Sequence, residues 1–148
     1  HPDRFSNKSD REQQYSTQHA AELNAAYSTL RDPLARGRYL LALAAPELTL
    51  RSAYRDSAEQ LDEVMEVREE LAGEPAQARL LLMYAENESK KQRLLTEVAA
   101  AFARRDYPAA AQRLGALSYW CSVEIELRSQ LPGDALAALL GQMPRKAC

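Results

Sequence analysis

The sequence predicts an all-α protein. Its 148 residues include only 5 Gly and 7 Pro and are rich in Ala, Leu, Glu, Gln and Arg, which favour helix. The runs of β-branched residues from which a sheet would be built are missing. Apolar residues recur instead at the spacing of amphipathic helices, in segments bounded by Pro and Gly. A chain of this length forms one domain or two small ones.

The overall charge and hydropathy exclude two classes of partner. A net charge of -2 offers no basic face that would neutralise the phosphates of a nucleic acid. No apolar run approaches the length of a membrane-spanning helix. The fractions of apolar and charged residues, 46% and 27%, are those of a globular protein. We therefore expect neither nucleic acid nor a membrane as a partner.

The two cysteines favour neither a disulfide framework nor a metal site. Cys121 falls on the apolar face of a predicted helix, where a free thiol packs as a small hydrophobic group, and Cys148 ends the chain. A catalytic cysteine would need a histidine partner, and nothing in the sequence places His1 or His19 near Cys121. We expect no catalytic residue, no metal and no cofactor on this chain.

The first predicted helix follows a loop. Residues 1–8 are rich in turn-forming residues. Ser9 and Glu12 then form a capping box, and the helix that it opens is expected to end at about Arg31. The apolar positions of this helix are Tyr15, Ala20, Leu23, Tyr27 and Leu30.

Asp32 and Pro33 end that helix and begin a second one. Aspartate is a favourable N-cap, and proline at the first helical position loses no hydrogen bond. The second helix ends before Pro46 and carries Leu34, Tyr39, Leu40 and Leu41. It is strongly apolar at its C-terminal end. A helix that is so short and apolar must lie against something larger.

The next helix follows a connector of residues 46–56, which shows no convincing period. Ser57 and Gln60 form a second capping box for a helix of residues 57–71. Gly73 suits a left-handed C-terminal cap for this helix.

Two long helices and a short one complete the chain. Pro75 begins a helix to about residue 105, Pro108 begins one to about residue 131, and Asp134 caps a last turn of helix through residue 140. The charged residues 86–93 are expected to form a solvated helix face. The core candidates of the two long helices are Leu80, Met83, Tyr84, Leu94, Leu95, Val98, Phe102, Leu114, Leu117, Trp120, Cys121, Leu127 and Leu131.

Short connections between three long amphipathic helices predict an antiparallel bundle. We therefore expect two units. Residues 1–45 form an N-terminal helix-loop-helix unit, residues 46–56 connect the units, and residues 57–148 form a three-helix bundle.

Three motifs follow one another in a fixed order along the first part of the chain. His1-Pro2-Asp3 comes first, residues 24–30 read Asn-Ala-Ala-Tyr-Ser-Thr-Leu, and residues 30–41 include Asp-Pro and end in Tyr-Leu-Leu. The tripeptide alone is a weak signal and by itself favours a plain terminal turn. The ordered series, however, resembles the second half of a J-domain, the module by which co-chaperones drive a DnaK-type ATPase chaperone.

More narrowly, the chain resembles the HscB-type J-proteins that serve iron–sulfur cluster assembly. Residues 30–41 and the run Met-Glu-Val-Arg-Glu-Glu-Leu at residues 65–71 resemble this family in sequence and order. A helical bundle follows directly, where other J-proteins continue with Gly/Phe-rich linkers and β-rich domains. The resemblance covers most of the chain and thins after Leu131.

The resemblance implies that the front motif engages the chaperone. The expected contact residues are His1, Pro2, Asp3 and Arg4. In a complete J-domain, Tyr27 and Leu30 pack inward against two preceding helices, which this chain does not include. Leu23 lies on the same face. We therefore expect these side chains to lack a core to face, and the chain alone to stimulate its chaperone poorly.

A helical wheel separates a buried stripe from a binding flank on residues 57–71. Val64, Val67 and Leu71 centre the buried stripe, and Leu61 and Met65 lie on one flank next to acidic residues. Tyr119, on the last long helix, points away from the apolar cluster of that helix and should be exposed. Such a surface fits a protein-binding patch. Equally, Met65 could complete the core, and a lone exposed tyrosine is common.

The resemblance implies that this flank docks the iron–sulfur cluster scaffold protein. The positions that match the family's docking residues are Leu61, Met65 and Tyr119, with Glu66 and Glu69 on the same face. Asp62 stands where some relatives have an apolar residue, so the patch is expected to be smaller or more polar here.

The favoured interpretation is a non-enzymatic co-chaperone with two partners, a DnaK-type chaperone and the iron–sulfur scaffold protein. It implies a soluble protein of the mitochondrial matrix, with the bacterial cytoplasm or the eukaryotic cytosol as alternatives. A helical adaptor with no chaperone link is the second interpretation. A small enzyme is a third, which the sequence does not favour because it contains no paired acid/base or nucleophile constellation.

Overall fold

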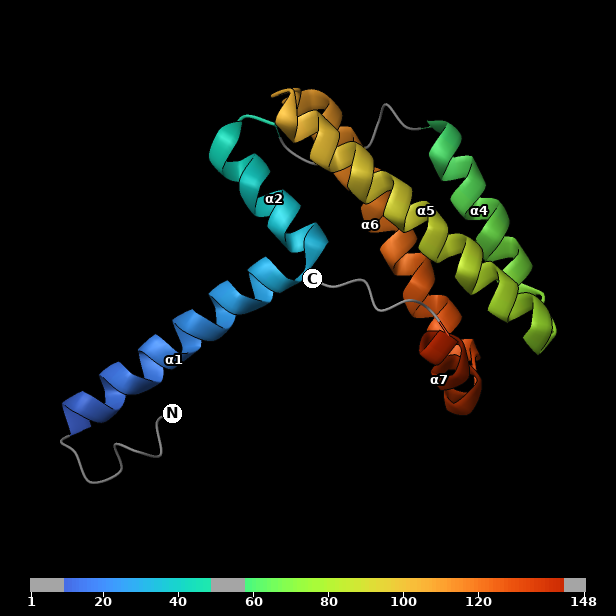
Figure 1. Ribbon diagram of the computed structural model, residues 1–148, viewed down its shortest axis with the longest axis horizontal. Helices are drawn as coiled ribbons and strands as arrows, with labels where there is room; N and C mark the ends of the chain where they lie inside the picture. The colour runs from blue at the N-terminus through green and yellow to red at the C-terminus, as the bar shows by residue number, and fades with distance from the viewer. Residues whose placement is uncertain (1–9, 49–57, 143–148) are drawn as a thin grey trace.

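The computed structural model describes residues 10–48 and 58–142, and within these ranges it contains helices and no strand. The predicted all-α class is therefore confirmed. The helices are α1 (Asp10–Arg31), α2 (Pro33–Ala44), α4 (Ala58–Ala72), α5 (Gln77–Ala103), α6 (Tyr107–Gln130) and α7 (Gly133–Gln142) (Figure 1).

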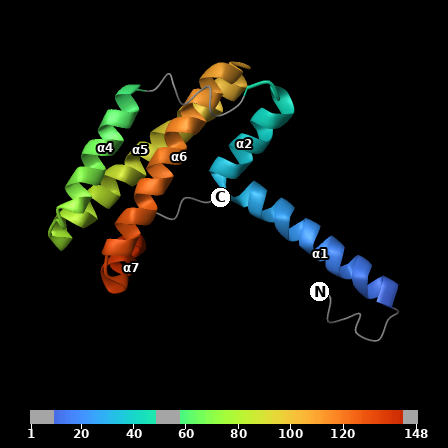
Figure 2. The same cartoon turned by 180° about the vertical axis from the view of Figure 1, so that it is seen from behind.

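The helices α4, α5 and α6 lie side by side as a bundle, and α1 leads away from it (Figures 1 and 2). The helix α5 runs antiparallel to α6, while α4 runs in the same direction as α6. This is the up-down-up arrangement expected for three helices joined by short connections. The predicted bundle of three long helices is confirmed.

The corner between α1 and α2 is built by local hydrogen bonds. The carboxylate of Asp32 accepts the backbone N–H groups of Leu34 and Ala35 at 3.3 and 3.0 Å. Pro33 occupies the first turn of α2. The Arg36 guanidinium donates to the carbonyl oxygen of Leu30 at 2.5 Å, which ties the end of α1 to the start of α2. The predicted N-cap is confirmed.

The helix α2 packs on α6 at a glycine. Gly37 is buried, and a Cβ atom at this position would collide with the side chain of Leu114. Leu41 and Ala45 lie in the same hydrophobic core as the α6 residues. The expectation that this short helix lies against something larger is thus confirmed, whereas the division of the chain into two units stays a prediction.

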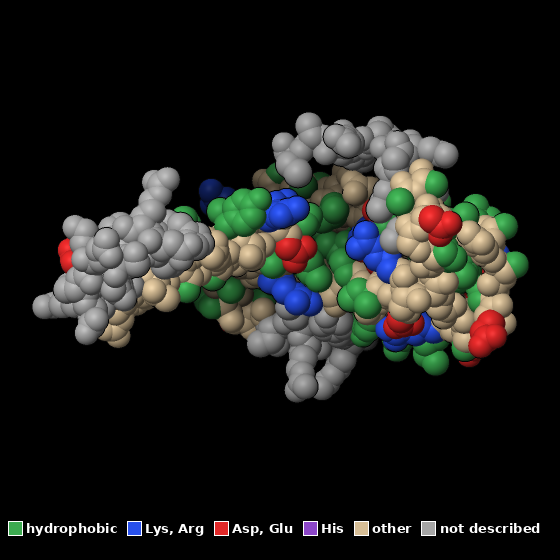
Figure 3. Space-filling view, turned by 90° about the horizontal axis from the view of Figure 1, so that it is seen from below, with side chains coloured by type: hydrophobic (Ala, Val, Ile, Leu, Met, Phe, Trp, Pro, Cys, Tyr) green, Lys and Arg blue, Asp and Glu red, His purple; other side chains and the backbone are tan. Residues whose placement is uncertain are grey.

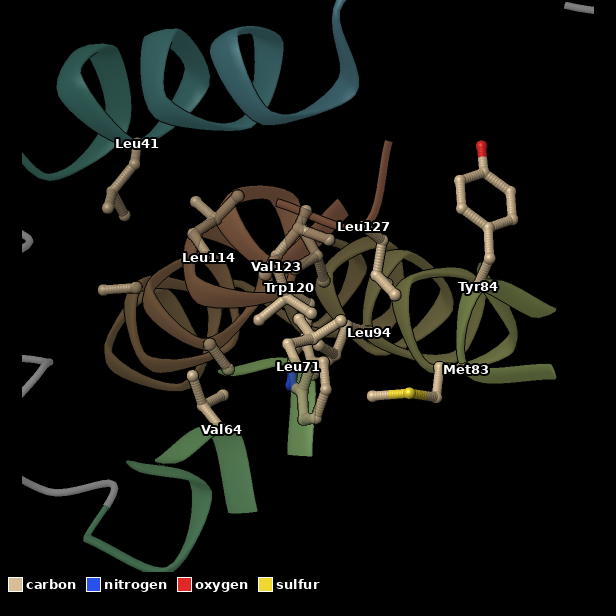
Figure 4. Close-up of a cluster of buried hydrophobic side chains, with 14 of the residues drawn as sticks. Leu41, Val64, Leu71, Met83, Tyr84, Leu94, Leu114, Trp120, Val123 and Leu127 are labelled. Carbon is tan, nitrogen blue, oxygen red and sulfur yellow. The ribbon is translucent and has the colours of Figure 1, made fainter. Parts of the chain in front are cut away.

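The hydrophobic core lies where α2 and α4 meet the α5–α6 pair. Figure 4 shows Leu41 of α2 reaching toward α6 from one side and Val64 of α4 reaching toward it from the other. Val123, which is absent from the predicted core, is fully buried. Leu95, Phe102 and Cys121 are half-buried and pack against the core. The predicted core residues confirmed as buried are Leu80, Met83, Tyr84, Leu94, Val98, Leu114, Leu117, Trp120, Leu127 and Leu131.

The turn between α4 and α5 differs from the prediction of a left-handed Gly73. Among the described residues no glycine has a positive φ, and Glu74 takes the left-handed conformation instead, with φ 51°. The N–H of Gly73 still donates to the carbonyls of Glu69 and Glu70, at 3.3 and 3.1 Å. The helical path therefore continues through Gly73, and the chain reverses one residue later.

The starts of the later helices are shifted by one or two residues. The helix α5 begins at Gln77 rather than at Pro75, because the extended Ala76 completes the reversal first. Asp106 caps α6 by accepting the N–H of Ala109 at 3.1 Å, and α7 begins at Gly133. The predicted loop of residues 1–8, most of the connector and Cys148 lie outside the described residues, as do Ser9 and Ser57, which would open the two capping boxes.

Candidate functional site

The helix α4 presents three different faces along its length. Val64 and Leu71 are buried in the bundle, and Val67 is half-buried beside them. Leu61 and Met65 are exposed by 40% and 51% on one edge. The carboxylates of Asp62, Glu66 and Glu69 are exposed on the outer face. The predicted separation of a buried stripe from an apolar flank is confirmed.

The register of α4 on α6 is fixed by Arg68 and Leu71. The Arg68 guanidinium donates to Ser122 Oγ at 3.0 Å and pairs with the Glu126 carboxylate at 2.8 Å. The amide of Gln130 donates to the carbonyl of Leu71 at 3.3 Å. Residue numbers rise together on the two helices from one contact to the next, so α4 and α6 run in parallel along this seam.

This register brings Met65 level with Tyr119. Met65 precedes Arg68 by three residues, and Tyr119 precedes Ser122 by three, so each lies about one helical turn from the Arg68–Ser122 bond in the same direction. Leu61 lies one further turn along the same edge of α4. The predicted apolar side chains of two different helices therefore share one surface along the α4–α6 seam.

Tyr119 is less accessible than predicted. Its side chain is half-buried and packs against the hydrophobic core, whereas the sequence predicts an exposed residue. The difference arises because α4 lies along α6 beside Tyr119, held by the bonds of Arg68. Part of the Tyr119 side chain thus stays accessible to solvent.

Arg68 is a candidate site residue absent from the sequence prediction. Its side chain is partly exposed and continues the edge formed by Leu61 and Met65. Arg68 follows Leu61 by seven residues and Met65 by three, so helical spacing places all three on one edge and could have identified Arg68 from the sequence. Its charge is already paired with Glu126, so we assign it to positioning α4 rather than to binding.

The acidic residues of α4 divide into paired and unpaired groups. Glu70 accepts two bonds from the Arg79 guanidinium, at 2.5 and 2.8 Å, and Glu63 pairs with Lys90. The hydrogen bond from Arg79 lowers the pKa of Glu70. Within the described part of the chain, the outer carboxylates Asp62, Glu66 and Glu69 form no ion pair. The outer face of α4 thus carries uncompensated negative charge beside the apolar edge.

The charged segment of α5 is more buried than the predicted solvated face. The Lys91 ammonium lies between the carboxylates of Glu88, at 2.6 Å, and Glu124, with its side chain only 13% exposed. Burial alone would lower the pKa of Lys91, but the hydrogen bonds to Glu124 and Glu88 outweigh it and raise that pKa. The hydroxyl of Tyr84 donates to Glu124 at 3.4 Å. This network joins α5 to α6.

The apolar face of α1 is open to solvent. Leu23, Tyr27 and Leu30 are 71%, 61% and 57% exposed, and none of them belongs to the hydrophobic core. The expectation that these side chains have no core to face is confirmed. His1, Pro2, Asp3 and Arg4 lie outside the described residues.

The described residues offer little for catalysis or metal binding. Residues 10–48 and 58–142 contain no group of three His, Cys, Asp or Glu side chains that could hold a metal ion. Burial raises the pKa of the free Cys121 thiol, which lowers its reactivity. No helix within these ranges is both long and apolar enough to cross a bilayer. Acidic and basic side chains are interspersed on the face shown in Figure 3, without a continuous basic surface.

Comparison with known sequences gives a consistent family signal. The family model of the HSCB C-terminal oligomerisation domain matches residues 56–128. The mouse iron–sulfur cluster co-chaperone protein HscB is 33% identical over 128 residues, 86% of this chain and 55% of the mouse protein. A Vibrio cholerae co-chaperone protein HscB homolog is 31% identical over 131 residues, covering 86% of this chain and 77% of that protein. The chain thus spans about half the length of its mammalian relatives.

Comparison with solved structures agrees. The crystal structure of human co-chaperone protein HscB matches with a TM-score of 0.79 and 32% identity, over 87% of this chain and 66% of the human chain. The Jac1 co-chaperone from Saccharomyces cerevisiae matches with a TM-score of 0.71 and 26% identity, over 83% and 80% of the two chains. These structures share the helical architecture described above.

Proposed function

The chain belongs to the HscB co-chaperone family, and from this membership we propose that it brings the iron–sulfur cluster scaffold protein to a DnaK-type chaperone. In this role it stimulates the ATPase of the chaperone and thereby promotes transfer of the cluster from the scaffold. The cluster is the cargo of the scaffold, and the ATPase activity belongs to the chaperone. In the proposed role, the chain is therefore an adaptor and activator rather than an enzyme.

The observation that carries the scaffold-binding half of the proposal is the surface along the α4–α6 seam. Leu61 and Met65 are exposed there, and Met65 lies level with the half-buried Tyr119. Apolar anchors at the centre of an interface supply most of its binding energy. The carboxylates of Asp62, Glu66 and Glu69 would steer a partner with a basic surface toward these anchors.

The chaperone-binding half of the proposal rests on the motif order and on family membership. We assign the contact with the ATPase domain to His1, Pro2, Asp3 and Arg4, which lie N-terminal to α1 in the sequence. A mitochondrial matrix location belongs to the same proposal and is supported by the similarity to mammalian relatives.

A titration of the scaffold protein onto this chain tests the proposed surface. We expect the Leu61→Ala/Met65→Ala variant to bind the scaffold at least about tenfold more weakly than the parent, because two apolar anchors are lost. Adding Tyr119→Phe isolates the contribution of the hydroxyl without removing a ring that packs against the core. Circular dichroism before each titration checks that the helices are retained.

The matched control removes exposed apolar surface elsewhere. Leu82 and Ile125 are 52% and 70% exposed and lie on α5 and α6. A Leu82→Ala/Ile125→Ala variant should bind the scaffold as the parent does. Equal losses in both double variants would contradict the proposed surface, and a folded parent that does not bind the scaffold would overturn the cluster-assembly function itself. Nucleotide-dependent binding to a DnaK-type chaperone separates this function from that of an adaptor without a chaperone link.

A further inference from the structure

A cleft lined by α4, α5 and α6 carries more positive than negative charge. Its volume is about 340 Å³, within the range of small-molecule sites, roughly 300–1,000 Å³. On α4 the cleft involves Glu63, which pairs with α5 and lies on the opposite edge of the helix from Leu61 and Met65. The residues that line the cleft are Glu63, Lys90, Arg93, Leu94, Glu97, Arg113 and Trp120.

Two of the three cations in this lining are neutralised by carboxylates. Lys90 pairs with Glu63, and Arg113 pairs with Glu97 at 2.6 Å. The third cation, Arg93, is exposed and forms no ion pair with the described residues. Glu97 lies one helical turn from Arg93 on α5, but its carboxylate is held by Arg113 instead. The lining therefore lacks one negative charge.

Arg93 acts electrostatically on a second cation of the cleft, Lys90. Burial lowers the pKa of Lys90, and the positive charge of Arg93 acts in the same direction. The Lys90 ammonium lies 4.6 Å from the centroid of the Trp120 ring, which holds it at the cleft. An anion seated beside both cations would be attracted by each of them and would offset their mutual repulsion.

The least exposed residues of the lining are apolar. Leu94 and Trp120 are 6% and 4% exposed and belong to the hydrophobic core, so the cleft reaches the core at these two side chains. An inorganic anion offers no apolar surface to them, and a phosphate group carries about 1.5 to 2 negative charges at pH 7, more than the single charge that is missing. An organic monocarboxylate supplies both the single charge and an apolar body.

We propose that this cleft binds an organic monocarboxylate, with its carboxylate beside Arg93 and its apolar body against Leu94 and Trp120. The Arg93 guanidinium donates two parallel N–H groups to the two carboxylate oxygens, a geometry that suits a planar carboxylate. Lys90 adds its positive charge without leaving Glu63. This site is separate from Leu61 and Met65 and goes beyond the proposed scaffold contact.

An NMR titration with isovalerate as the probe tests the proposal on the whole ¹⁵N-labelled chain at constant ionic strength. Isovaleramide is the matched control, because it has the same shape and no charge. We expect isovalerate to shift the Arg93 side-chain N–H and Trp120 indole signals saturably, and to bind at least about fivefold more tightly than isovaleramide. Inorganic phosphate should bind more weakly than isovalerate, because it cannot cover the apolar wall.

The Arg93→Gln variant should abolish the preference for isovalerate over isovaleramide. It should keep its fold, which circular dichroism checks, because the Arg93 side chain is exposed and has no ion-pair partner among the described residues. Arg38→Gln makes the same change in net charge at an exposed position of α2 and should leave the preference intact. Equal losses in the two variants would show that net charge rather than the cleft attracts the anion, and would overturn the proposal.

A pair of blocked peptides identifies the source of the carboxylate. Acetyl-Ala-Glu-Ala-N-methylamide is compared with acetyl-Ala-Gln-Ala-N-methylamide, which differs only in the charge of one side chain. A preference for the glutamate peptide indicates an acidic side chain of a partner protein, and a preference confined to free isovalerate indicates a small molecule. Equal binding of acid and amide in both pairs, or phosphate binding as tight as that of isovalerate, overturns the proposal.

Discussion

Gly37 sets how closely α2 approaches α6. The side chain of Leu114 fills the space where a Cβ atom of residue 37 would lie, and Leu114 is itself fully buried. Replacing glycine with alanine inside a helix gains about 1 kcal/mol from backbone propensity. Overpacking a close-packed core costs about 1–3 kcal/mol. The two effects oppose each other, and the packing cost is the larger.

We therefore expect Gly37→Ala to lower the free energy of unfolding by up to about 2 kcal/mol, as measured by urea denaturation. The sign should reverse in a Leu114→Ala background, where the new methyl group has space and only the gain in helix propensity remains. A Gly37→Ala substitution that destabilises both backgrounds equally would show that contact with Leu114 is not the cause.

Because of Lys91, the packing of α5 on α6 is expected to lose stability at alkaline pH. Its pKa is raised in the folded protein above the ordinary 10.5, so its stabilising contribution is fully present below about pH 10.5 and is lost as the pH rises through the folded pKa. Burial and the Glu124 carboxylate also raise the pKa of Tyr84, which acts in the same direction above about pH 10.

The Lys91→Met variant should test this pH dependence. At neutral pH we expect it to lose about 1–3 kcal/mol, between the values for surface and buried ion pairs, because Glu88 and Glu124 are left without their cation. Between pH 7 and 11, the free energy of unfolding from urea denaturation should fall less steeply with pH for the variant than for the parent. Adding Glu124→Gln should restore part of the loss at neutral pH, and parallel pH curves for parent and variant would contradict this role of Lys91.

At the scale of helices, α1 has an apolar stripe that packs on no other helix among the described residues. Leu23, Tyr27 and Leu30 are all more than half exposed. Isolated helices are marginally stable in water, and most helical stability comes from tertiary packing. We expect the amide protons of α1 to exchange with solvent far faster than those of α5 and α6 in hydrogen-exchange measurements.

Leu23→Ala should change the free energy of unfolding by less than about 0.5 kcal/mol, against about 2–5 kcal/mol for the buried control Leu127→Ala.

Features set by local chemistry were predictable from the sequence. The Asp32 cap needs only the three residues that follow it, and the buried stripe of α4 follows from the spacing of Val64 and Leu71. Features set by a neighbouring helix were not predictable. Tyr119 is half-buried because α4 lies beside it, and Lys91 is buried because α6 places Glu124 opposite it.

At the scale of the whole molecule, α4 has one edge that holds the bundle together and one face that is free for a partner. Glu63 and Glu70 bridge α4 to α5 through Lys90 and Arg79. The outer carboxylates have no such partner within the described residues and contribute nothing evident to the fold. Negative charge that the fold does not neutralise is suited to steering an incoming partner.

Reversing this charge tests whether it serves association. We expect Glu66→Lys/Glu69→Lys to reduce the rate of association with the scaffold protein about tenfold at low salt, because the attraction to a basic partner becomes repulsion. The effect should shrink as salt shortens the Debye length to about 10 Å at 0.1 M. Glu47→Lys/Asp134→Lys makes the same change in net charge at exposed positions outside α4 and should slow association much less. If both variants slow association equally in stopped-flow measurements, net charge rather than the α4 face governs the encounter.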